Sequence, residues 1–293
     1  MTEIESIKRC ILSQMPLKWQ NILKKYSFSG LEEIRFRLFS PVMLYYSDKR
    51  EVLKDFTEPK DTETLLLCAC KNSLYSYSES IKKGFVTLSG GHRMGISGRG
   101  VVTGGEISGI SRIFGINIRI AKEIKNCSNS VFGKIYESGR VKNTLILSPP
   151  SAGKTTLLRD ITRKLSENFK VCVIDERSEI AALTFDEKGF DIGIQTDVYD
   201  MVPKTKGIFM ALRSLSPEVI VTDEVDTEAD LFAVKSIIGA GAKIITSAHC
   251  EDFSKFKEKR KDFLSLFDVC IILSRRCGAG TVEEVFSFDK SYI

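Results

Sequence analysis

Histidine is scarce and Cys-x-x-Cys pairs are missing in this chain of 293 residues, which argues against a structural zinc site. There are two histidines and one tryptophan, and none of the eight cysteines stands in a Cys-x-x-Cys pair. A structural zinc site needs about four Cys or His ligands at short spacings. Several cysteines lie in apolar runs such as Val171-Cys172-Val173, where a thiol packs as a small hydrophobe. We therefore expect reduced thiols, as in a cytosolic protein.

Long apolar runs and strong charge are also missing. No apolar stretch approaches the ~20 residues needed to span a bilayer, and the first residues, Met-Thr-Glu-Ile-Glu, carry no signal-peptide pattern. We expect contact with a membrane to occur through a partner or a surface. The formal net charge of +5 is modest, and aromatic residues do not interleave with basic ones, so we expect no nucleic-acid partner.

The length and the ordinary globular composition allow two domains, and the two halves differ in pattern. Residues 1–122 mix helical and strand patterns and predict a smaller α+β domain. Helices are expected over 4–25 and 62–82, and strands over 33–38, 42–46, 85–88 and 116–120. The glycine- and arginine-containing stretch 90–100 predicts turns between short strands.

Residues 123–293 alternate strand and helix, which is typical of a parallel sheet with crossover helices. The strands are short, continuous apolar runs, as expected where helices cover both faces of the sheet. They are predicted over 144–147, 171–174, 218–222, 243–247 and 268–273. The charged stretch Lys255–Lys261 indicates a solvated helix face.

Residues 144–156 carry the strongest functional signal, because an apolar strand runs into a tight loop and then a helix that starts at Gly153-Lys154-Thr155. This is the context of a phosphate-binding loop, where backbone N–H groups and a helix N-terminus favour an anion. Ser148 stands where the motif has glycine, and two prolines that fix φ follow it. An unrelated helix start is the alternative. The predicted nucleotide-binding residues are Pro149, Pro150, Ser151, Ala152, Gly153, Lys154, Thr155 and Thr156.

Ionisable residues follow the other predicted strands at the edge where ligands of parallel sheets bind. Asp223 fits an acid that holds Mg²⁺ together with Thr155, and Glu224 is placed to activate water. A solvated acidic pair that caps the next helix is the alternative. Glu176 is a second candidate for polarising water, although its segment could equally be a loop held by salt bridges. His249 could contact the γ-phosphate, and Arg213 could stabilise charge or lie on the surface.

At these residues the chain resembles the stage III sporulation protein AA family of endospore-forming bacteria and, more distantly, type II and type IV secretion ATPases. The resemblance covers nearly the whole chain. It rests on linked segments that include Gly90-Gly91-His92-Arg93-Met94-Gly95-Ile96, Ile174-Asp175-Glu176-Arg177-Ser178-Glu179 and Arg213-Ser214-Leu215-Ser216-Pro217. Others are the stretches 31–37, 84–87, 117–121, 195–198 and 218–224.

The resemblance implies a RecA-like P-loop NTPase core, residues 123–293, behind the N-terminal α+β domain. It implies ATP and Mg²⁺ as cofactors, a homo-hexameric ring, and a role in powering a channel between mother cell and forespore. Membrane-protein components of that channel would be its partners, and the mother-cell cytoplasm its location. It also implies inter-subunit contacts from arginines of the N-terminal domain, with Arg93, Arg99, Arg112 and Arg119 as candidates. Two alternatives remain open: a nucleic-acid-stimulated motor and an ATP-binding scaffold without hydrolysis.

Overall fold

The computed structural model describes residues 2–184 and 189–288, and the chain divides into two compact units. The first unit comprises Met1–Lys122 together with Ala182–Gly189, and the second comprises Glu123–Ala181 and Phe190–Ile293. Residues 182–189 thus fall in the first unit, although the sequence pattern predicts them within the second domain. The chain therefore passes between the units three times, at 122/123, 181/182 and 189/190.

The first unit is built on a six-stranded antiparallel sheet with the order β3-β2-β1-β6-β5-β4. The strands are β1 (Leu31–Arg37), β2 (Pro41–Tyr46), β3 (Arg50–Phe56), β4 (Phe85–Thr87), β5 (Arg93–Thr103) and β6 (Glu106–Arg119). Apolar residues alternate along the central strands, so that Ile34 and Phe36 of β1 are fully buried beside more exposed neighbours. This alternation places one face of the sheet on the core.

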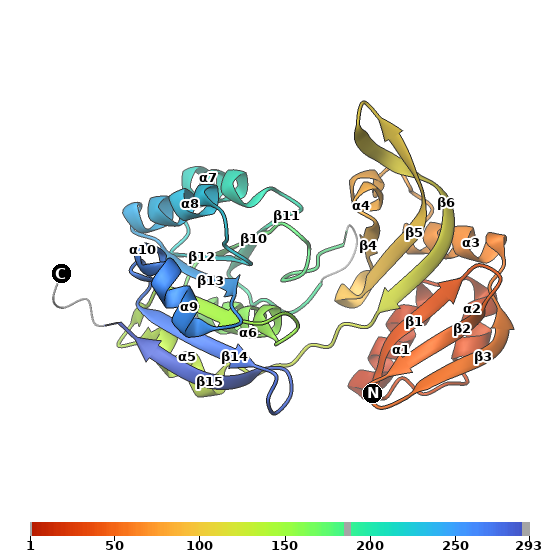
Figure 1. Ribbon diagram of the computed structural model, residues 1–293, viewed down its shortest axis with the longest axis horizontal. Coiled ribbons are helices and arrows are strands. Elements are labelled where there is room, and N and C mark those ends of the chain that lie inside the picture. The colour runs from red at the N-terminus through yellow and green to blue at the C-terminus, as the bar shows by residue number, and fades with distance from the viewer. Residues whose placement is uncertain (1, 185–188, 289–293) are drawn as a thin grey trace. The chain divides into compact units, whose positions relative to one another are not determined.

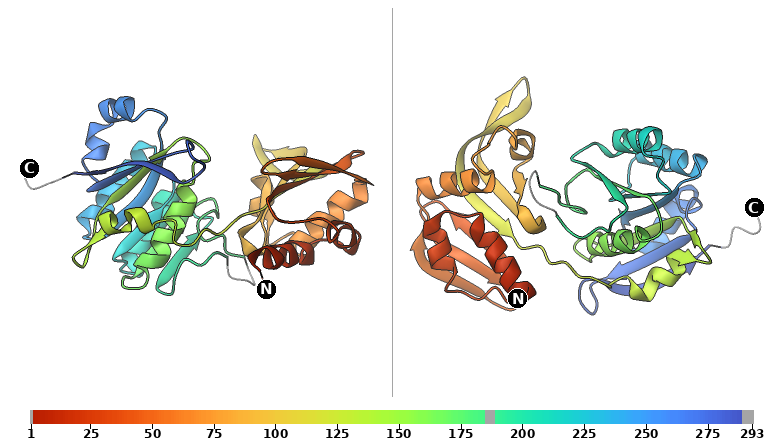
Figure 2. Two further views of the ribbon diagram at one scale, coloured as in Figure 1. Left: turned by 90° about the horizontal axis from the view of Figure 1, so that it is seen from below. Right: turned by 180° about the vertical axis from the view of Figure 1, so that it is seen from behind.

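The helices of this unit supply the other side of that core (Figure 2). They are α1 (Glu3–Ser13), α2 (Leu17–Leu23), α3 (Pro59–Ala69), α4 (Ser78–Lys82) and the short 3-10 turn η1 (Ser89–Gly91). Two single-helix predictions were wrong. The helix expected over 4–25 is broken at Pro16, which precedes α2 and cannot continue a helical hydrogen-bond ladder. The helix expected over 62–82 is interrupted after α3, where Lys71 and Asn72 have positive φ.

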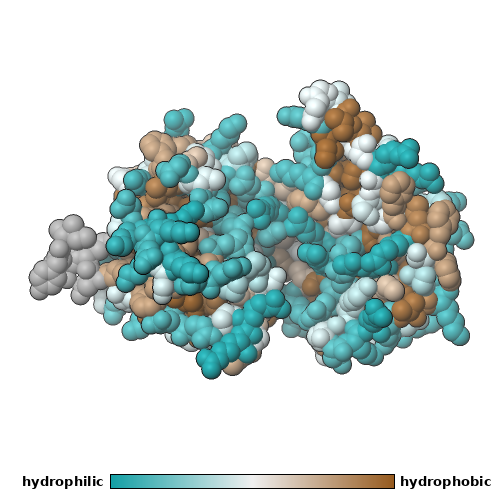
Figure 3. Space-filling view, viewed as in Figure 1, coloured by the Kyte–Doolittle hydropathy of each residue, from teal (hydrophilic) through white to brown (hydrophobic). Residues whose placement is uncertain are grey.

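Strands β5 and β6 form a ribbon whose outer half, beyond Ile96 and Phe114, pairs only with itself. The turns predicted within 90–100 are therefore wrong beyond η1. Glycine is needed for close approach instead, because a Cβ on Gly98 would lie 2.0 Å from the Arg112 carbonyl oxygen. Three register shifts along the pair bulge β6. Hydrophobic side chains gather towards the end of the ribbon, where Val102 and Ile107 are exposed (Figure 3).

The second unit contains a seven-stranded sheet with the order β11-β10-β12-β13-β9-β14-β15. All neighbours are parallel except β14 and β15. The strands are β9 (Thr144–Ser148), β10 (Val171–Asp175), β11 (Thr196–Asp200), β12 (Val219–Thr222), β13 (Lys243–His249), β14 (Val269–Ser274) and β15 (Thr281–Ser287). A separate two-stranded piece joins β7 (Tyr136–Glu137) to β8 (Arg140–Val141). The five predicted strands are present, whereas β11 and β15 were not predicted.

Helices cover both faces of this sheet (Figure 1). Helices α5 (Asn129–Ile135) and α6 (Lys154–Leu165) pack on the face that carries Ile146, and α7 (Lys204–Ser214), α8 (Glu228–Gly239) and α10 (Lys261–Leu264) pack on the face that carries Leu145 and Leu147. Burial on both sides explains the continuous apolar strands. Helix α9 (Phe253–Lys259) carries the charged stretch, and its lysines are exposed.

Membrane-spanning helices and disulfides can both be checked among the residues that the structure describes. None of the helices among them combines the length and apolarity that crossing a bilayer requires. No disulfide links any of the cysteines, all eight of which lie within 2–184 and 189–288.

Candidate functional site

The loop between β9 and α6 is a close-packed turn whose shape depends on glycine at one position. Gly153 precedes α6 with φ of +93°, in the region that favours glycine. A Cβ there would lie 3.0 Å from the Gly280 backbone nitrogen, and the Gly280 N–H donates to the Ala152 carbonyl at 2.9 Å. The segment before β15 therefore buttresses the loop and fixes the start of α6.

Ser148 departs from the usual loop motif without disturbing the turn. It is buried, and it is not among the residues with positive φ, so the freedom of glycine is not required there. Its hydroxyl donates to the Pro149 carbonyl at 2.7 Å and lies 3.3 Å from Lys154 Nζ, which can donate to it. Serine thus satisfies polar groups inside the loop that glycine would leave to water.

Lys154 lies at the centre of the site. Its Nζ is 3.0 Å from His249 Nδ1 and 3.4 Å from the Ser148 carbonyl oxygen. An ammonium can only donate, so Nδ1 accepts and the neutral imidazole carries its proton on Nε2. Burial lowers the pKa of Lys154, and the nearby Glu224 opposes that shift.

Glu224 joins this group from the end of β12. Its carboxylate accepts a hydrogen bond from His249 Nε2 and forms an ion pair with Arg177 Nη1 at 2.8 Å. Its φ of +32° is uncommon for a residue other than glycine. The backbone is held there because the Glu224 N–H donates to Ser247 Oγ at 3.2 Å and its carbonyl accepts from Lys204 Nζ. Such strain, held in place by neighbours, is common at functional sites.

Asp223, the residue before Glu224, is buried. Burial raises its pKa to about 6, with smaller increases from Asp175 and Glu179, while Lys204 and Arg177 act in the opposite direction. A nearby cation would favour the ionised form of such a buried carboxyl group.

The predicted residues largely meet at one cavity of about 490 Å³ at the carboxyl ends of the strands. It is lined by Pro150, Ser151, Ala152, Gly153, Lys154, Thr155, Thr156, Arg177, Glu179, Asp223, Glu224, Ser247, His249 and Ala279. Pro149 is not among them. Glu176 lines a neighbouring cavity of about 690 Å³, which it shares with Glu224 and His249.

Four residues that help to form the site escaped the sequence analysis. Arg177 and Glu179 follow β10 in the segment already noted for Glu176, so their position was a usable signal. Ser247 and Lys204 act through the Glu224 backbone, and no sequence motif marks that role. Arg213 is exposed on α7 and lines neither of these two cavities.

The four arginines considered in the first unit fall into two groups. Arg93 packs over the Phe85 ring at 3.8 Å, and Arg119 pairs with Glu33 at 3.6 Å. Arg99 and Arg112 are exposed and lie directly opposite each other on the ribbon, and Arg112 also lies 5.8 Å from the centre of the Phe114 ring. Like charges opposite each other on a ribbon are destabilising, so this pair is better suited to an anion than to the isolated fold.

The donor set fits Mg²⁺ bound together with a nucleotide. The Thr155 hydroxyl and the Asp223 carboxyl line the same cavity. No group of three or more Asp, Glu, His or Cys that could hold a metal alone occurs within 2–184 and 189–288. Mg²⁺ commonly takes one or two protein ligands and completes its shell with water and phosphate oxygens.

A phosphate loop after β9, an acidic pair after β12 and a parallel sheet between helices define a RecA-like P-loop NTPase core, here preceded by a smaller α+β domain. Solved structures share this fold. The ATPase DotB of Legionella pneumophila is similar with a TM-score of 0.61 and 15% identity, over 94% of this chain and 82% of that one. The pilus retraction motor PilT with bound ADP is similar with a TM-score of 0.57 and 16% identity, over 93% and 78%.

The chain belongs to the family described as sporulation stage III, protein AA, whose model matches residues 5–291. Stage III sporulation protein AA of Bacillus subtilis (strain 168) is 36% identical over 274 residues, which covers 90% of this chain and 89% of that protein. The family predicted from the sequence segments is confirmed.

Proposed function

We propose that this protein is a Mg²⁺-dependent ATPase that powers a channel complex between mother cell and forespore. The observation that carries the proposal is the convergence of Lys154, Glu224 and His249 on one cavity, at the loop that opens α6. Family membership supports the sporulation role, and the fold of the secretion ATPases supports a motor.

Phosphate binding would fall to the loop. Residues 151–153 and the first turn of α6 present backbone N–H groups at a helix N-terminus, which favours negative charge, while Pro149 and Pro150 have no N–H and would shape the loop. Lys154 would exchange His249 for the β- and γ-phosphates, while Thr155 and Asp223 would hold Mg²⁺. When bound, Mg²⁺ neutralises charge on the phosphate oxygens.

Hydrolysis would depend on Glu224 as the group that orients and deprotonates the attacking water. Arg177 and His249 hold its carboxylate in place. His249 would report on the γ-phosphate, since it contacts both the phosphate-binding lysine and the base. Glu176, which shares a cavity with these two, would help to polarise the water.

The assembly we propose is a homo-hexameric ring. An exposed arginine pair, Arg99 and Arg112, would approach the nucleotide of a neighbouring subunit, because an anion would offset the repulsion between two like charges that face each other on the ribbon. The ring would work in the mother-cell cytoplasm against membrane-protein components of the channel. No nucleic acid is expected to take part.

Measuring ATP binding and ATP turnover separately on three proteins tests the proposal. Wild type should bind and hydrolyse ATP, and Lys154→Ala should lose binding. Glu224→Gln, which keeps size and polarity, should bind ATP and lose at least about a hundredfold in turnover. Undiminished turnover by Glu224→Gln would remove Glu224 from its role, and binding without turnover by wild type would indicate the scaffold alternative.

A further inference from the structure

On the second-unit side, the segments next to all three crossings between the units contact side chains of α6, the helix whose N-terminus carries Lys154 and Thr155. On the second-unit side, the first crossing begins with residues 123–128. The other two are the ends of the 182–189 excursion, namely residues 179–181 and 190–193. Adjacent residues on α6, Arg159 and Asp160, hold these segments.

Asp160 fastens the first segment. Its carboxylate accepts the Asn126 and Ser128 backbone N–H groups, each at 2.9 Å, and the Ser128 hydroxyl at 2.6 Å. Arg163 pairs with the same carboxylate at 2.8 Å, and the Asp160 side chain is 2% exposed. Burial alone would raise its pKa, but these donors hold the pKa at about 2. The segment is therefore fixed to α6 through a permanently charged group.

Arg159 fastens both ends of the excursion. Its guanidinium donates to the carbonyls of Ile180 and Glu179, each at 2.9 Å, and lies 3.4 Å from the centre of the Phe190 ring. The Phe190 N–H donates to the Ala181 carbonyl at 2.9 Å, which closes the excursion at its base. A buried arginine with both donor sides used is a rigid connection.

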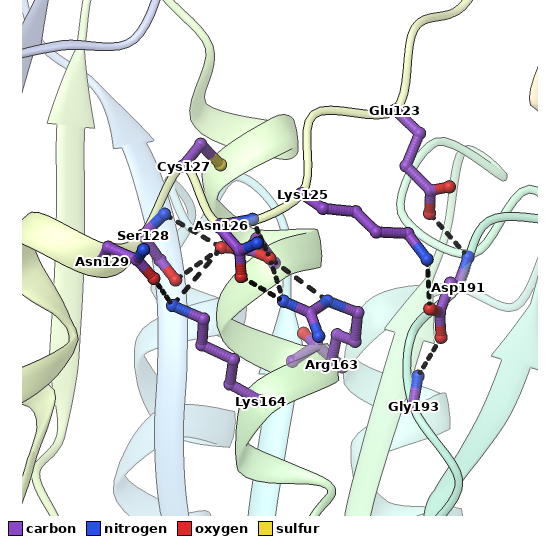
Figure 4. A network of polar contacts seen from close by, with 12 residues as sticks. Glu123, Lys125, Asn126, Cys127, Ser128, Asn129, Arg163, Lys164, Asp191 and Gly193 are labelled. Atoms are coloured by element: carbon purple, nitrogen blue, oxygen red, sulfur yellow. Dashed lines mark hydrogen bonds and ion pairs between the residues drawn. The ribbon is translucent and has the colours of Figure 1, made fainter. Parts of the chain in front are cut away.

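Residues 123–128 and residues 190–193 also contact each other directly (Figure 4). Lys125 Nζ pairs with Asp191 Oδ2 at 2.7 Å, and the Asp191 N–H donates to the Glu123 carboxylate at 2.8 Å. Arg163 and Lys164 of α6 reach the side chains of Asn126 and Asn129. The segments next to the three crossings are thus bonded to one another and to the middle of α6.

The first-unit end of the linker is fixed as well. The Ala121 N–H donates to Nδ1 of the buried His92 at 3.1 Å, and the Ile120 N–H donates to the Glu32 carbonyl at 2.9 Å. Burial lowers the pKa of His92 to about 4, so Nδ1 remains an acceptor near neutral pH. The linker is thus hydrogen-bonded to the first unit at Ala121 and to α6 at Asn126.

We propose that Arg159 and Asp160 are positioning residues that transmit nucleotide occupancy from the N-terminus of α6 to the segments joining the two units. Asp160 lies six residues after Lys154, or about 9 Å along a helix, and a helix moves as a rigid element over that length. We call Arg159 and Asp160 together the clamp. If phosphate replaces His249 at Lys154 and shifts the first turn of α6, the clamp therefore shifts by the same amount. The inference rests on the proposed nucleotide binding at the loop.

Hydrogen exchange of the full chain, with and without Mg²⁺ and a non-hydrolysable ATP analogue, tests the clamp. Analogue binding is titrated on the same samples. In wild type, nucleotide should change exchange over 122–129 and 189–195 by about tenfold, the scale of ordinary site coupling. In Asp160→Asn, which keeps size but loses the negative charge that accepts hydrogen bonds from Asn126, Ser128 and Arg163, the analogue should still bind, and the change should shrink to under about twofold.

Two further variants complete the test. Arg159→Lys keeps the charge but loses the second donor and the stacked plane, and should abolish the nucleotide effect over 189–195. Asp61→Asn is the matched control, since Asp61 is a buried carboxylate of the first unit that accepts a backbone N–H at 2.8 Å and pairs with Lys18. It should keep the full nucleotide effect.

The outcomes separate the two proposals. Wild type that binds the analogue without a change at these segments overturns the clamp alone, even if a variant fails to fold. Variants that keep the wild-type change also overturn it. A wild type that binds no analogue overturns both the clamp and the nucleotide site.

Discussion

Replacing Asp223 by Asn should remove function and stabilise the empty protein. Burial raises the Asp223 pKa from 3.8 to about 6, so its carboxylate is costly to form in the folded state. A pKa raised by folding favours the folded state below about pH 4, and this contribution is lost as the pH rises through about 6. Near neutral pH, the folded apoprotein therefore holds a carboxylate that the unfolded chain ionises more easily.

The magnitude follows from the pKa difference. One pH unit corresponds to about 1.4 kcal/mol, so the cost at pH 7.5 is on the order of 3 kcal/mol. An uncharged amide avoids this cost, although it must find its own hydrogen bonds. We expect Asp223→Asn to raise the unfolding free energy by about 1–3 kcal/mol at pH 7.5 and by about 0.5 kcal/mol at pH 4.

Urea unfolding at the two pH values measures this difference. Trp19, the single tryptophan, is buried in the first unit, so its fluorescence reports on that unit, whereas far-UV circular dichroism reports on both. The gain should appear in the dichroism transition and not in the fluorescence transition. Asp160→Asn should instead lower the unfolding free energy at pH 7.5, because the surroundings of Asp160 stabilise its carboxylate. An Asp223→Asn variant that is no more stable at pH 7.5, or whose gain is independent of pH, would refute the reasoning.

Three further predictions concern the site and the ribbon. Ser148→Gly should not raise turnover and should cost about 0.5–1 kcal/mol of stability, since Ser148 does not have positive φ; turnover and urea unfolding measure the two effects, and a faster enzyme would contradict this account of the loop. His249→Ala should release Lys154, leaving ATP binding intact and slowing turnover by about ten- to a hundredfold. Titration of ATP and steady-state assays measure the two effects, and weakened ATP binding would instead show that His249 helps to bind the nucleotide. If Arg112 acts across subunits, mixing inactive Arg112→Ala with inactive Lys154→Ala should restore turnover, and failure to restore it would exclude that role.

The core strands of the second unit were predictable because their chemistry is local. Residues such as Leu145, Ile146 and Leu147 form a continuous apolar run only because both faces of the sheet are covered, and the polar residues that follow each strand mark its carboxyl end. The edge strand β11 escaped because Thr196–Asp200 is partly exposed and polar and has no such run. Its position depends on pairing with β10, which is a tertiary effect.

Helix breaks and the clamp depended on particular contacts. Pro16 is an interruption that the sequence displays, yet the apolar spacing on either side of it outweighed it in the prediction of a single helix. Nothing local reveals that Asp160 accepts from Asn126 and Ser128, or that Lys204 holds the Glu224 carbonyl, because these partners come together only when the sheet forms. Several residues that line the cavity could be predicted from the strand ends, whereas the residues that position them could not.

A structure of the full chain crystallised with Mg²⁺ and a non-hydrolysable ATP analogue tests the nucleotide site most directly. The account predicts the β- and γ-phosphates over the N-terminus of α6 within hydrogen-bonding distance of Lys154 Nζ, with Mg²⁺ between Thr155 and Asp223 and with His249 released from the lysine. An analogue bound elsewhere, or a site in which Lys154 keeps its contact with His249 while nucleotide is present, would contradict it.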